Sequence, residues 1–346
     1  MHHGLAPRPG EDAITLGAQA QGGAQTQAQA QVQVQATAGA IWPQAADGAG
    51  EDATPGLVTW KTCAQRPTGS LSALRRGSLT FVGTGIRLVS QMTPEAMACI
   101  RRATKLFYLV VDGATETWLR RLNKTAESLA DCYAQGKPRQ ESYVQMVGRI
   151  LPCVRAGEEV CVAFYGHPGV FVWPSHEAMR IARREGFPAK MLPAISAEDC
   201  LFADLGIDPA RDGCQSFEVT DFLLRRRRFD TSCSLILWQI GVIGELSVRL
   251  TAPYNSRALG VLANLLRRHY PAHHEVVIYE AARYPIGEPS ILRVPLSKLG
   301  TVTPRAMATL YVPPRRSVRP VSARMLGRLG MATGARRDSR SRQRGA

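Results

Sequence analysis

The chain has 346 residues, 45% of them apolar, and its formal net charge is +15 at pH 7. This length suits two domains and this apolar share can fill a core, which excludes a chain that is disordered throughout. None of the eight cysteines forms a CxxC pair and several lie in apolar runs, which excludes a zinc ribbon and a disulfide framework.

Residues 1–76 form a segment rich in Gln, Ala and Gly, with the stretch QGGAQTQAQAQVQVQATAGA at its centre. Such a composition buries little apolar surface, so we expect this segment to be disordered. The N-terminus has no basic segment followed by an apolar one, so it does not read as a signal peptide. The longest apolar stretch, near LILWQIGVIGEL, is too short and too polar to span a bilayer, and we expect a soluble, cytoplasmic protein.

Residues 77–193 alternate between apolar runs and helical patterns. The sequence predicts strands at 78–83, 106–111, 160–166 and 189–193, and helices at 93–103, 141–157 and 175–186. Thr93 and Pro94 mark the first helix start, as N-cap and first helical residue. Strands that alternate with helices indicate an α/β domain with a largely parallel sheet.

Residues 194–314 are richer in strands. The sequence predicts one clear helix at 256–270 and strands at 232–241, 245–250, 275–282, 290–296 and 308–313. This pattern indicates a second, α+β domain. Two packed domains leave a cleft between them, which is the usual place for a small-molecule site.

Residues 315–346 form a basic tail with ten arginines and one acid, Asp338. A tail of this kind can bind nucleic acid or an acidic partner. No aromatic residues interleave the arginines as a stacking surface would need. This favours a solvated, disordered tail, and nucleic acid is not the expected partner.

Two glycine-rich turns follow predicted strands. Gly83-Thr84-Gly85 lacks the third glycine of a dinucleotide fingerprint, which leaves open a weak dinucleotide site, a tight turn, or a turn that packs against a ligand. Gly166-His167-Pro168-Gly169 leaves the carboxyl end of a strand, where open α/β sheets bind ligands. His167 could be a base or a metal ligand, but no cluster of His, Asp or Glu with ligand spacing accompanies it, so no metal is expected.

A polar patch lies at the start of the helix predicted at 141–157. Arg139 and Tyr143 are four residues apart and project from one face if the segment is helical. An arginine beside a phenol favours the phenolate, which would draw the tyrosine pKa from about 10 toward neutrality. A surface cation–π contact is the alternative interpretation.

The segment ISAEDCL, after the strand at 189–193, contains a helix start. Ser196 and Asp199 have the spacing of a capping box, with Asp in place of the usual Glu or Gln. The exposed N–H groups of this helix start could also bind a ligand.

Four segments together resemble a known family. GSLTFVGTGI, FYGHPGVFV, KMLPAISAEDCLFADLGIDP and LILWQIGVIG lie between residues 77 and 314 in the order and with the spacing of the tetrapyrrole methylase superfamily of S-adenosylmethionine-dependent methyltransferases. More narrowly, they are similar to the borosin enzymes, which N-methylate peptide backbones. Porphyrin methylases carry a GxGPGD start, which GTGIRL at 83–88 lacks, and this favours the borosin branch.

The resemblance implies a fold and a cofactor. It implies a tetrapyrrole methylase-like α/β fold, with two α/β domains and a cleft between them that holds S-adenosyl-L-methionine. The positions that match the family's donor-binding residues are Tyr165, His167, Val170, Ser196, Ala197 and Gln239. Pro295 and Leu296 are expected at the edge of the adenine pocket, and no metal is needed.

The resemblance also implies the residues around the reacting amide, which match Tyr133, Arg139 and Tyr143 here. A peptide nitrogen is a poor nucleophile because its lone pair is delocalised into the carbonyl. Its proton must be removed and the imidate-like oxygen stabilised. Tyr143, made more acidic by Arg139, is the expected base, and Arg139 and Tyr133 are expected to hydrogen-bond the oxygen.

The resemblance bears on partners as well. Fungal members carry their substrate as an apolar C-terminal extension, and this sequence ends without a Val/Ile-rich peptide, so we expect a split system with a separate precursor peptide. Family members are interlocked homodimers, and a homodimer is expected here. Two alternatives stay open: a methyltransferase of tetrapyrrole-like small molecules, with basic residues in place of Tyr133 and Tyr143, and a catalytically silent module that uses its basic tail.

Overall fold

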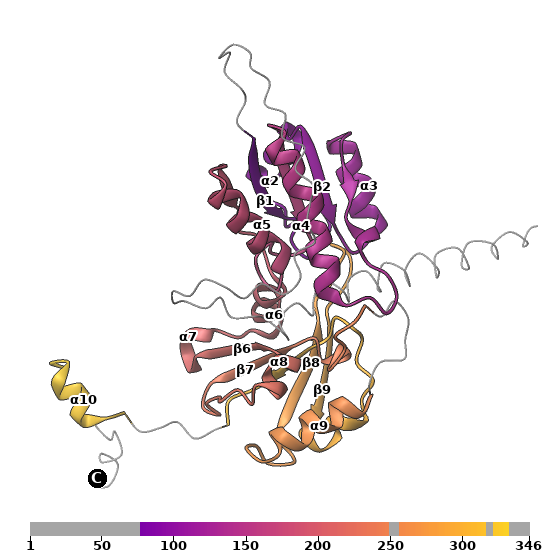
Figure 1. The fold of residues 1–346 in the computed structure, drawn as a ribbon. Coiled ribbons are helices and arrows are strands. Elements are labelled where there is room, and N and C mark those ends of the chain that lie inside the picture. Colours follow the sequence, from indigo (N-terminus) through magenta and orange to yellow (C-terminus); the bar gives the residue numbers. More distant parts are fainter. Residues whose placement is uncertain (1–76, 249–255, 316–320, 332–346) are drawn as a thin grey trace, which may run out of the picture.

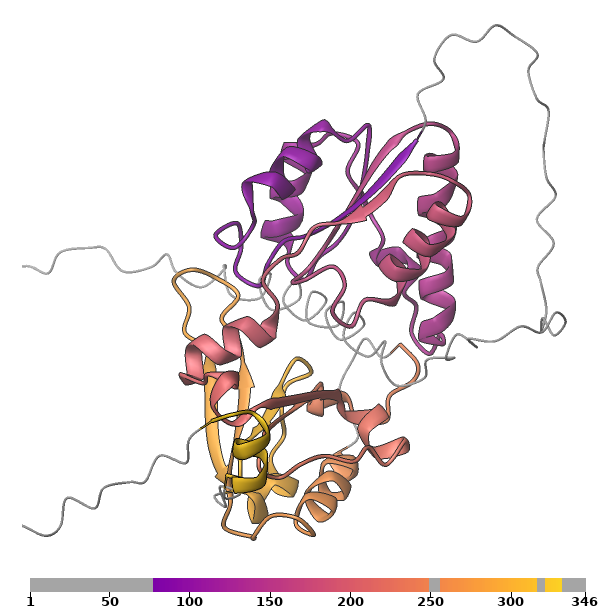
Figure 2. The same cartoon turned by 90° about the vertical axis from the view of Figure 1, so that its left-hand side faces the viewer.

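The computed structural model describes residues 77–248, 256–315 and 321–331 (Figure 1). The predicted disorder of residues 1–76 and of most of the basic tail therefore lies outside the described residues. The described chain contains two five-stranded sheets, one built from residues 78–191 and the other from residues 214–312. Figure 2 shows them as two separate layered units, one above the other.

The first sheet is parallel throughout and has the strand order β3-β2-β4-β1-β5. Its strands are β1 (Ser78–Gly83), β2 (Lys105–Leu109), β3 (Glu127–Ser128), β4 (Glu159–Phe164) and β5 (Ala189–Met191). The near-continuous apolar runs of β1, β2 and β4 are typical of strands that helices cover on both faces. This confirms the predicted parallel α/β architecture.

Helices cover both faces of the first sheet. They are α2 (Pro94–Arg102), α3 (Gly113–Leu122), α4 (Arg139–Arg155) and α5 (Trp173–Arg184). Residues of α4 and α5 pack with alternate residues of β1, β2 and β4 in one core, and residues of α2 and α3 pack on the opposite face. The predicted cap of α2 is confirmed, because the Thr93 side chain accepts a hydrogen bond from the Ala96 N–H at 3.1 Å.

The second sheet is mixed and has the order β6-β7-β10-β8-β9. Its strands are β6 (Cys214–Glu218), β7 (Ser234–Trp238), β8 (Glu275–Glu280), β9 (Ser290–Pro295) and β10 (Thr309–Val312). Only β6 and β7 pair in parallel. The remaining elements are α6 (Ala197–Leu205), α7 (Pro209–Asp212), α8 (Val219–Leu224), α9 (Ser256–Leu266), α10 (Ala323–Arg328), η1 (Ala130–Cys132), η2 (Ile240–Val242) and η3 (Leu296–Thr301).

One face of the second sheet packs against the first unit. Helix α9, with η3, covers the other face. The cluster between the units combines Ile86, Tyr165 and Phe171, which lie in loops of the first sheet, with Trp238, Tyr279 and neighbouring strand residues of the second. The loops that leave the carboxyl ends of β1 and β4 therefore face the second sheet, which places the glycine-rich turns between the two units.

The strand predicted at 245–250 is not formed as a strand within the described residues. Ser247 makes only an isolated bridge with Pro138, and residues 249 and 250 lie outside the description. Val248 crosses instead to the first unit, where it is fully buried in the core with α4 and pairs with Lys137 through a 2.8 Å backbone hydrogen bond. Within this segment Val248 therefore makes a contact between the units, whereas Leu246 is 46% exposed.

Several elements were not predicted: the strands β3 and β6, the helices α3, α7, α8 and α10, and the short helices η1, η2 and η3. Strand β3 has two residues and leaves no periodic signal, whereas α3 begins at a recognisable cap, Asp112, whose side chain accepts from the Thr115 N–H at 2.8 Å. Helix α10 lies in the tail predicted to be disordered, and it buries none of its residues and stands apart from both sheets (Figure 1).

All seven cysteines in the described part of the chain are free thiols. Four of them, including Cys161 in β4, are nine-tenths buried or more and pack as small apolar side chains. No helix in the described ranges has the length and apolar character needed to cross a membrane.

Candidate functional site

A cleft with a volume of about 90 Å³ lies between the two units, at the carboxyl end of β4. It is lined by Ile86, Tyr165, Gly166, His167, Val170, Phe171, Val172, Ser196, Ala197, Glu198, Trp238, Gln239, Met307 and Thr309. The structure thus brings together six residues that the sequence singled out from three distant segments: Tyr165, His167, Val170, Ser196, Ala197 and Gln239. Open α/β sheets bind ligands at this edge, where the carboxyl ends of their strands meet.

The turn Gly83-Thr84-Gly85 packs directly against the loop that follows β4. Gly85 and Gly166 exchange two backbone hydrogen bonds, at 3.0 and 3.3 Å. A Cβ atom added to Gly83 would lie 2.1 Å from the Gly166 carbonyl oxygen. Of the three interpretations left open, the structure shows a tight turn whose glycines permit this close approach. Neither Gly83 nor Gly85 lines the cleft.

His167 is held in one orientation inside its loop. Its Nδ1 accepts a hydrogen bond from the Gly169 N–H at 3.0 Å, so in the neutral ring the proton is on Nε2. Burial lowers the pKa of His167, and the nearby Asp199 carboxylate opposes this only in part. At neutral pH the ring is therefore an uncharged group with its Nε2–H free to donate a hydrogen bond.

Two non-glycine residues of the cleft have strained backbones. Phe171 has a φ of 57° and Gln239 a φ of 68°, in the left-handed region that favours glycine. The rings of Phe171 and Trp238 meet with centroids 5.8 Å apart across the two units. The Oε1 atom of Gln239 is buried and has no hydrogen-bond partner within the described part of the chain. Backbone strain and an unpaired buried acceptor in one cleft point to a ligand site.

The helix start at Ser196 has the predicted capping box. The Ser196 hydroxyl accepts from the N–H groups of Glu198 and Asp199, and the Asp199 carboxylate accepts from the Ser196 N–H at 2.7 Å. This arrangement fixes Glu198 at the wall of the cleft, where burial raises the pKa of its carboxyl group. Glu198 was missed as a site residue although it lies within the quoted segment KMLPAISAEDC.

Tyr133, Arg139 and Tyr143 form a buried polar cluster beside the cleft. Their exposed fractions are 7%, 5% and 3%, which excludes the alternative of a surface cation–π contact. Arg139 and Tyr143 lie one turn apart at the start of α4, and Tyr133 follows η1. The Tyr133 hydroxyl and the Nε and Nη1 atoms of Arg139 have no hydrogen-bond partner among the described residues. Unpaired donors at this depth cost stability unless a ligand satisfies them.

The predicted acidity of Tyr143 is wrong. Burial raises its pKa well above the usual value, and the Arg139 charge lowers it by less. Burial likewise raises the pKa of Tyr133, with Tyr143 adding to the increase. The sequence showed an arginine one turn away but could not show that the phenol is enclosed, and desolvation outweighs the charge. Both tyrosines are protonated phenols at neutral pH.

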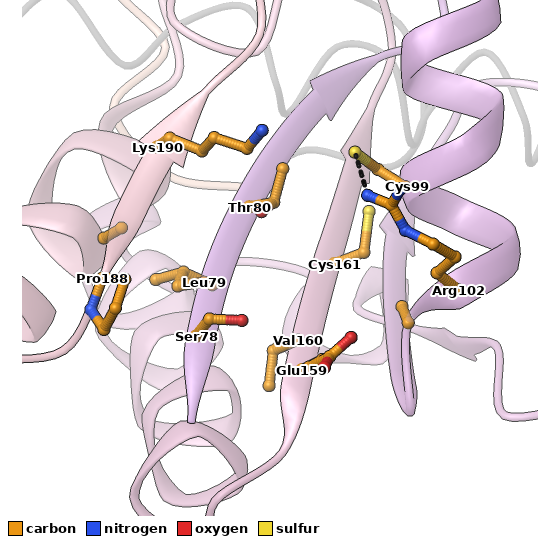
Figure 3. Close-up of a pocket in the computed structure, with 12 residues that line it drawn as sticks. Ser78, Leu79, Thr80, Cys99, Arg102, Glu159, Val160, Cys161, Pro188 and Lys190 are labelled. Carbon is orange, nitrogen blue, oxygen red and sulfur yellow. Dashed lines mark hydrogen bonds between the residues drawn. The ribbon is translucent and has the colours of Figure 1, made fainter. Parts of the chain in front are cut away.

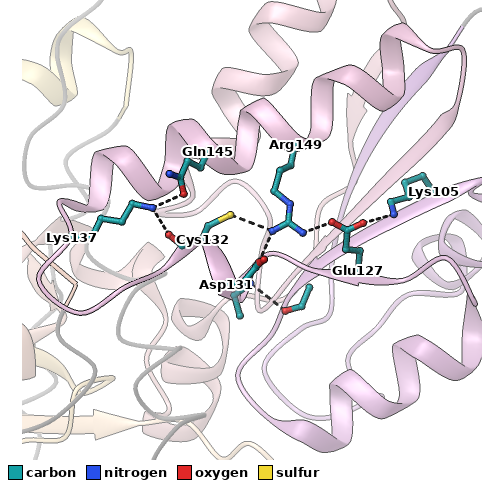
Figure 4. A network of polar contacts seen from close by, with 9 residues as sticks. Lys105, Glu127, Asp131, Cys132, Lys137, Gln145 and Arg149 are labelled. Carbon is teal, nitrogen blue, oxygen red and sulfur yellow. Dashed lines mark hydrogen bonds and ion pairs between the residues drawn. The ribbon is translucent and has the colours of Figure 1, made fainter. Parts of the chain in front are cut away.

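A polar network fixes the loop that carries Tyr133 (Figure 4). Arg149 of α4 contacts the carboxylates of Glu127 and Asp131, and Lys105 contacts Glu127 from the other side. Lys137 donates to the Cys132 carbonyl oxygen at 2.7 Å. The loop before α4, which carries Tyr133, is thereby tied to this helix.

The polar cluster and the cleft share a wall. The rings of Tyr143 and Trp173 lie 6.3 Å apart, and Trp173 directly follows Val172, which lines the cleft. Tyr133, Tyr143 and Val172 also belong to the same apolar core. A group bound in the cleft and a group bound at Arg139 would therefore be neighbours.

Pro295 and Leu296 do not line this cleft. Leu296 is fully buried in the core around α9. Pro295 pairs with Glu275 at the start of β8, whereas the cleft lies beside Thr309, which pairs with Tyr279 near the other end of that strand. The sequence resemblance placed both residues at the edge of the adenine pocket. In the structure they lie at the end of the β8–β9 hairpin that is away from the cleft.

A second hollow, of about 460 Å³, lies on the first sheet near the amino ends of β1, β4 and β5 (Figure 3). Its floor is formed by strand residues and its side by Cys99 and Arg102 of α2. It contains none of the predicted site residues and lies at the strand end where α/β sheets do not bind their ligands. Within the described ranges, no group of three or more His, Cys, Asp or Glu side chains is placed to hold a metal ion.

Comparison with known proteins gives matches over the same part of the chain. Residues 78–300 match the family of tetrapyrrole (corrin/porphyrin) methylases. Over 243 residues the chain is 47% identical to a methyltransferase and gymnopeptide cyclic peptide precursor from Gymnopus fusipes, covering 69% of this chain and 58% of that one. Over 245 residues it is 43% identical to the corresponding omphalotin A precursor from Omphalotus olearius, covering 70% of this chain and 58% of that one.

Solved structures share the fold at low sequence identity. Uroporphyrin-III C-methyltransferase from Thermus thermophilus aligns with a TM-score of 0.51 at 18% identity, over 69% of this chain and 93% of that one. The methyltransferase CobJ aligns with a TM-score of 0.51, also at 18% identity, over 70% of this chain and 97% of that one. The chain thus spans nearly all of these structures, but 58% of the length of each of the two cyclic peptide precursors.

Proposed function

The chain belongs to the tetrapyrrole methylase family, and from this premise we propose that it transfers methyl groups from S-adenosyl-L-methionine to backbone amide nitrogens of a precursor peptide. The relatives at 47% and 43% identity are named as methyltransferases joined to cyclic peptide precursors, which supports a peptide substrate. The observation that carries the proposal is the buried arginine with two unpaired N–H groups beside the cleft.

The residues of the cleft fit the methyl donor. The free Nε2–H of His167, the unpaired Oε1 of Gln239 and the carboxylate of Glu198 offer one hydrogen-bond donor and two acceptors. Glu198 suits a ribose hydroxyl, and the apolar side chains of Val170 and Trp238 suit the adenine face. The bound donor would supply an electrophilic methyl group on a sulfonium ion.

The polar cluster suits the chemistry of an amide. Its nitrogen becomes nucleophilic when the N–H proton leaves and negative charge moves to the oxygen. The Nε–H and Nη1–H of Arg139 and the hydroxyl of Tyr133 are donors that can hold this oxygen in a site closed to water. Tyr143, in its phenolate form, accepts the N–H proton. Because its pKa is raised, this phenolate is a strong but scarce base.

Tetrapyrrole-like small molecules are the weaker second candidate. A site for such molecules is expected to have basic residues in place of Tyr133 and Tyr143, because these would bind the acidic side groups of the substrate. Both tyrosines are present and buried, and the residues that line the cleft include no lysine or arginine. The solved structures, at 18% identity, support the fold alone.

Supply of the peptide in trans, a homodimer and a cytoplasmic location stay predictions within this proposal. The two modes of supply can be compared with one Val/Ile-rich peptide, which is either fused to the C-terminus of the chain or added as a separate molecule. Methylation of the separate peptide by the unfused chain supports supply in trans. Light scattering of the full chain measures its oligomeric state.

Tandem mass spectrometry of these peptides tests the reaction itself. We expect added methyl masses on backbone nitrogens with the wild-type chain. Arg139→Ala and Tyr143→Phe should lower kcat by about 100-fold or more, because each removes stabilisation or deprotonation of the amide. Calorimetry should show S-adenosylmethionine binding unchanged in both variants. Near-normal methylation by both would refute the assignment, and failure of the wild type to bind the donor would favour the silent binding module.

A further inference from the structure

A basic surface lies at one end of the second unit. Its exposed arginines belong to the segments that follow α8, α9 and β10, and they are Arg225, Arg226, Arg227, Arg228, Arg267, Arg268 and Arg315. Among the described residues, only the first and third of these seven form ion pairs, both with Asp221 of α8. The surface therefore carries positive charge that the fold does not neutralise.

The acids at this end of the unit do not offset the excess, because they have partners of their own. The ion pairs are Asp221 with Arg225 and Arg227, Asp212 with Arg211, and Glu275 with Arg293. Asp230 accepts hydrogen bonds from the N–H and the hydroxyl of Ser232.

The three segments touch one another. The rings of Phe229 and His269 lie 4.9 Å apart. The Arg315 N–H donates to the Thr231 carbonyl oxygen at 2.8 Å, and Arg315 Nη1 donates to the His269 carbonyl oxygen at 3.2 Å. Arginines that are far apart in the sequence are thus gathered on one surface.

This surface lies at the end of the second sheet that is opposite to the cleft. Strand β7 begins at Ser234, soon after the arginine run, and ends at Trp238, which lines the cleft. Strand β10 runs antiparallel to it from Thr309 at the cleft, so Arg315 emerges at the far end. Five strand residues span about 17 Å, at about 3.4 Å per residue. Figure 1 shows α9 at the same far end, away from the first unit.

Arg226 holds a backbone position that favours glycine. Its φ is 49°, and it directly follows the last turn of α8. The Arg226 N–H donates to the Leu223 carbonyl oxygen and the Arg227 N–H to the Phe222 carbonyl oxygen, which is the helix ending that usually has glycine at this position. An arginine here projects a charge where a residue without a side chain would fit more easily.

The surface suits the carboxylates of an acidic peptide segment. Guanidinium groups bind carboxylates through paired hydrogen bonds, and Asp221 already receives two arginines in this way. Single-stranded nucleic acids also need exposed aromatic rings on which bases stack. Here Phe229 is half-buried between His269 and Tyr270, and Tyr270 is 2% exposed. The chemistry of the surface therefore favours a peptide over a nucleic acid.

We propose that this basic surface binds an acidic segment of the precursor peptide, at a distance from the residues that are methylated. The inference rests on the proposed function for the identity of the peptide, whereas binding of an acidic segment can be measured without turnover. Docking at this surface raises the local concentration of the peptide at the cleft and leaves the chemical step unchanged. Because the surface and the cleft are about 17 Å apart, the two peptide segments need a spacer of at least about five extended residues.

Fluorescence anisotropy with the full chain tests the binding step. The probe is a labelled Val/Ile-rich peptide joined through a Gly/Ser spacer of about ten residues to a run of glutamates. The matched probe has glutamines in place of these glutamates. We expect the acidic probe to bind about tenfold or more tightly at low ionic strength, and about 0.5 M salt to remove most of the difference.

Two double variants with equal loss of charge locate the binding site. Arg226→Gly with Arg228→Gln removes two charges from the basic surface, and glycine suits the end of α8. Arg101→Gln with Arg121→Gln removes two exposed arginines from the first unit and is the control. The Kd of the acidic probe should rise about fivefold or more in the first variant and stay within about twofold of the wild type in the second.

Three results of the binding experiment would overturn the proposal. The first is equal affinity for the two probes. The second is an equal loss of affinity in both double variants, because only net charge would then matter. The third is a single-stranded DNA of the same charge that binds more tightly than the acidic probe and is lost in Arg226→Gly with Arg228→Gln, which would assign the surface to nucleic acid.

Methylation kinetics give the second readout. The run of glutamates should lower KM by about tenfold and leave kcat within about twofold. A spacer of about two residues cannot reach the cleft, so it should cancel the gain in KM while the Kd stays low. A gain in KM that does not depend on spacer length would contradict docking at this surface. If no peptide is methylated, the proposed function fails, and the anisotropy alone decides whether the surface binds acidic segments.

Discussion

Tyr143 is a buried phenol with a raised pKa, and this determines how the rate should depend on pH. Below that pKa the phenolate fraction grows about tenfold for each unit of pH. We expect log kcat to rise steadily from about pH 7 to about pH 9.5 without a plateau, since the group stays mostly protonated over this range. Kinetics at saturating donor and peptide measure this profile.

The Tyr143→Phe variant is the control for this pH dependence. Its residual rate should be low and should change little with pH, because the titrating phenol is gone. A wild-type plateau near about pH 8 would contradict the account, because it would mean that Arg139 outweighs burial and makes Tyr143 acidic.

His167 has two ring nitrogens with separate roles, which two substitutions can distinguish. Nδ1 accepts from the Gly169 N–H and shapes the loop, whereas Nε2–H faces the proposed donor. His167→Asn can keep the loop hydrogen bond and removes the Nε2–H, so we expect S-adenosylmethionine to bind about tenfold more weakly with little loss of stability. His167→Gln should mainly lower the free energy of unfolding. Calorimetry and denaturant unfolding give the two values, and unchanged donor affinity in His167→Asn would exclude a role in binding.

The two glycine-rich turns act as one structural element. Gly83→Ala would bring a Cβ atom within 2.1 Å of the Gly166 carbonyl oxygen and 2.4 Å of the Ala194 Cβ. We expect it to lower the free energy of unfolding by about 2 kcal/mol or more and to weaken donor binding, because the loop after β4 must shift. Denaturant unfolding measures the stability change.

Gly148 in the middle of α4 is the matched control for this substitution. It is exposed, and a Cβ atom added there meets nothing within 4 Å. Gly148→Ala should therefore stabilise the chain by about 0.5–1 kcal/mol, as expected for a helix interior. Equal effects of the two substitutions would contradict the close packing of the turns.

At the scale of elements, the sequence predicts a strand or helix correctly where several local signals fall within a few residues. The apolar runs of β1 and β4, the Thr93 cap and the Ser196 capping box are each encoded within a few residues, and the structure confirms them. The segment 245–250 has an alternating pattern as well, but its partner is residue 137, more than a hundred positions earlier. Local periodicity does not indicate which unit a segment joins.

At the scale of the whole molecule, the candidate site depends on how the two units meet. The motifs FYGHPGVF and SAEDC identified most of the cleft, because glycine-rich loops and caps at strand ends carry strong local signals. Two features could not be predicted: the net pKa of Tyr143 and the burial of Leu296 in the core around α9. Each depends on burial, which arises when residues from distant segments pack together.

A crystal structure of the chain with S-adenosylmethionine is the most direct test of the central claim, that the cleft between the units holds the donor beside the amide-binding cluster. We predict that the ligand contacts His167 and Gln239 and that its sulfonium methyl group faces Arg139 and Tyr143. A ligand in the hollow at the amino ends of β1, β4 and β5, or one whose methyl group points away from Tyr143, would contradict the account.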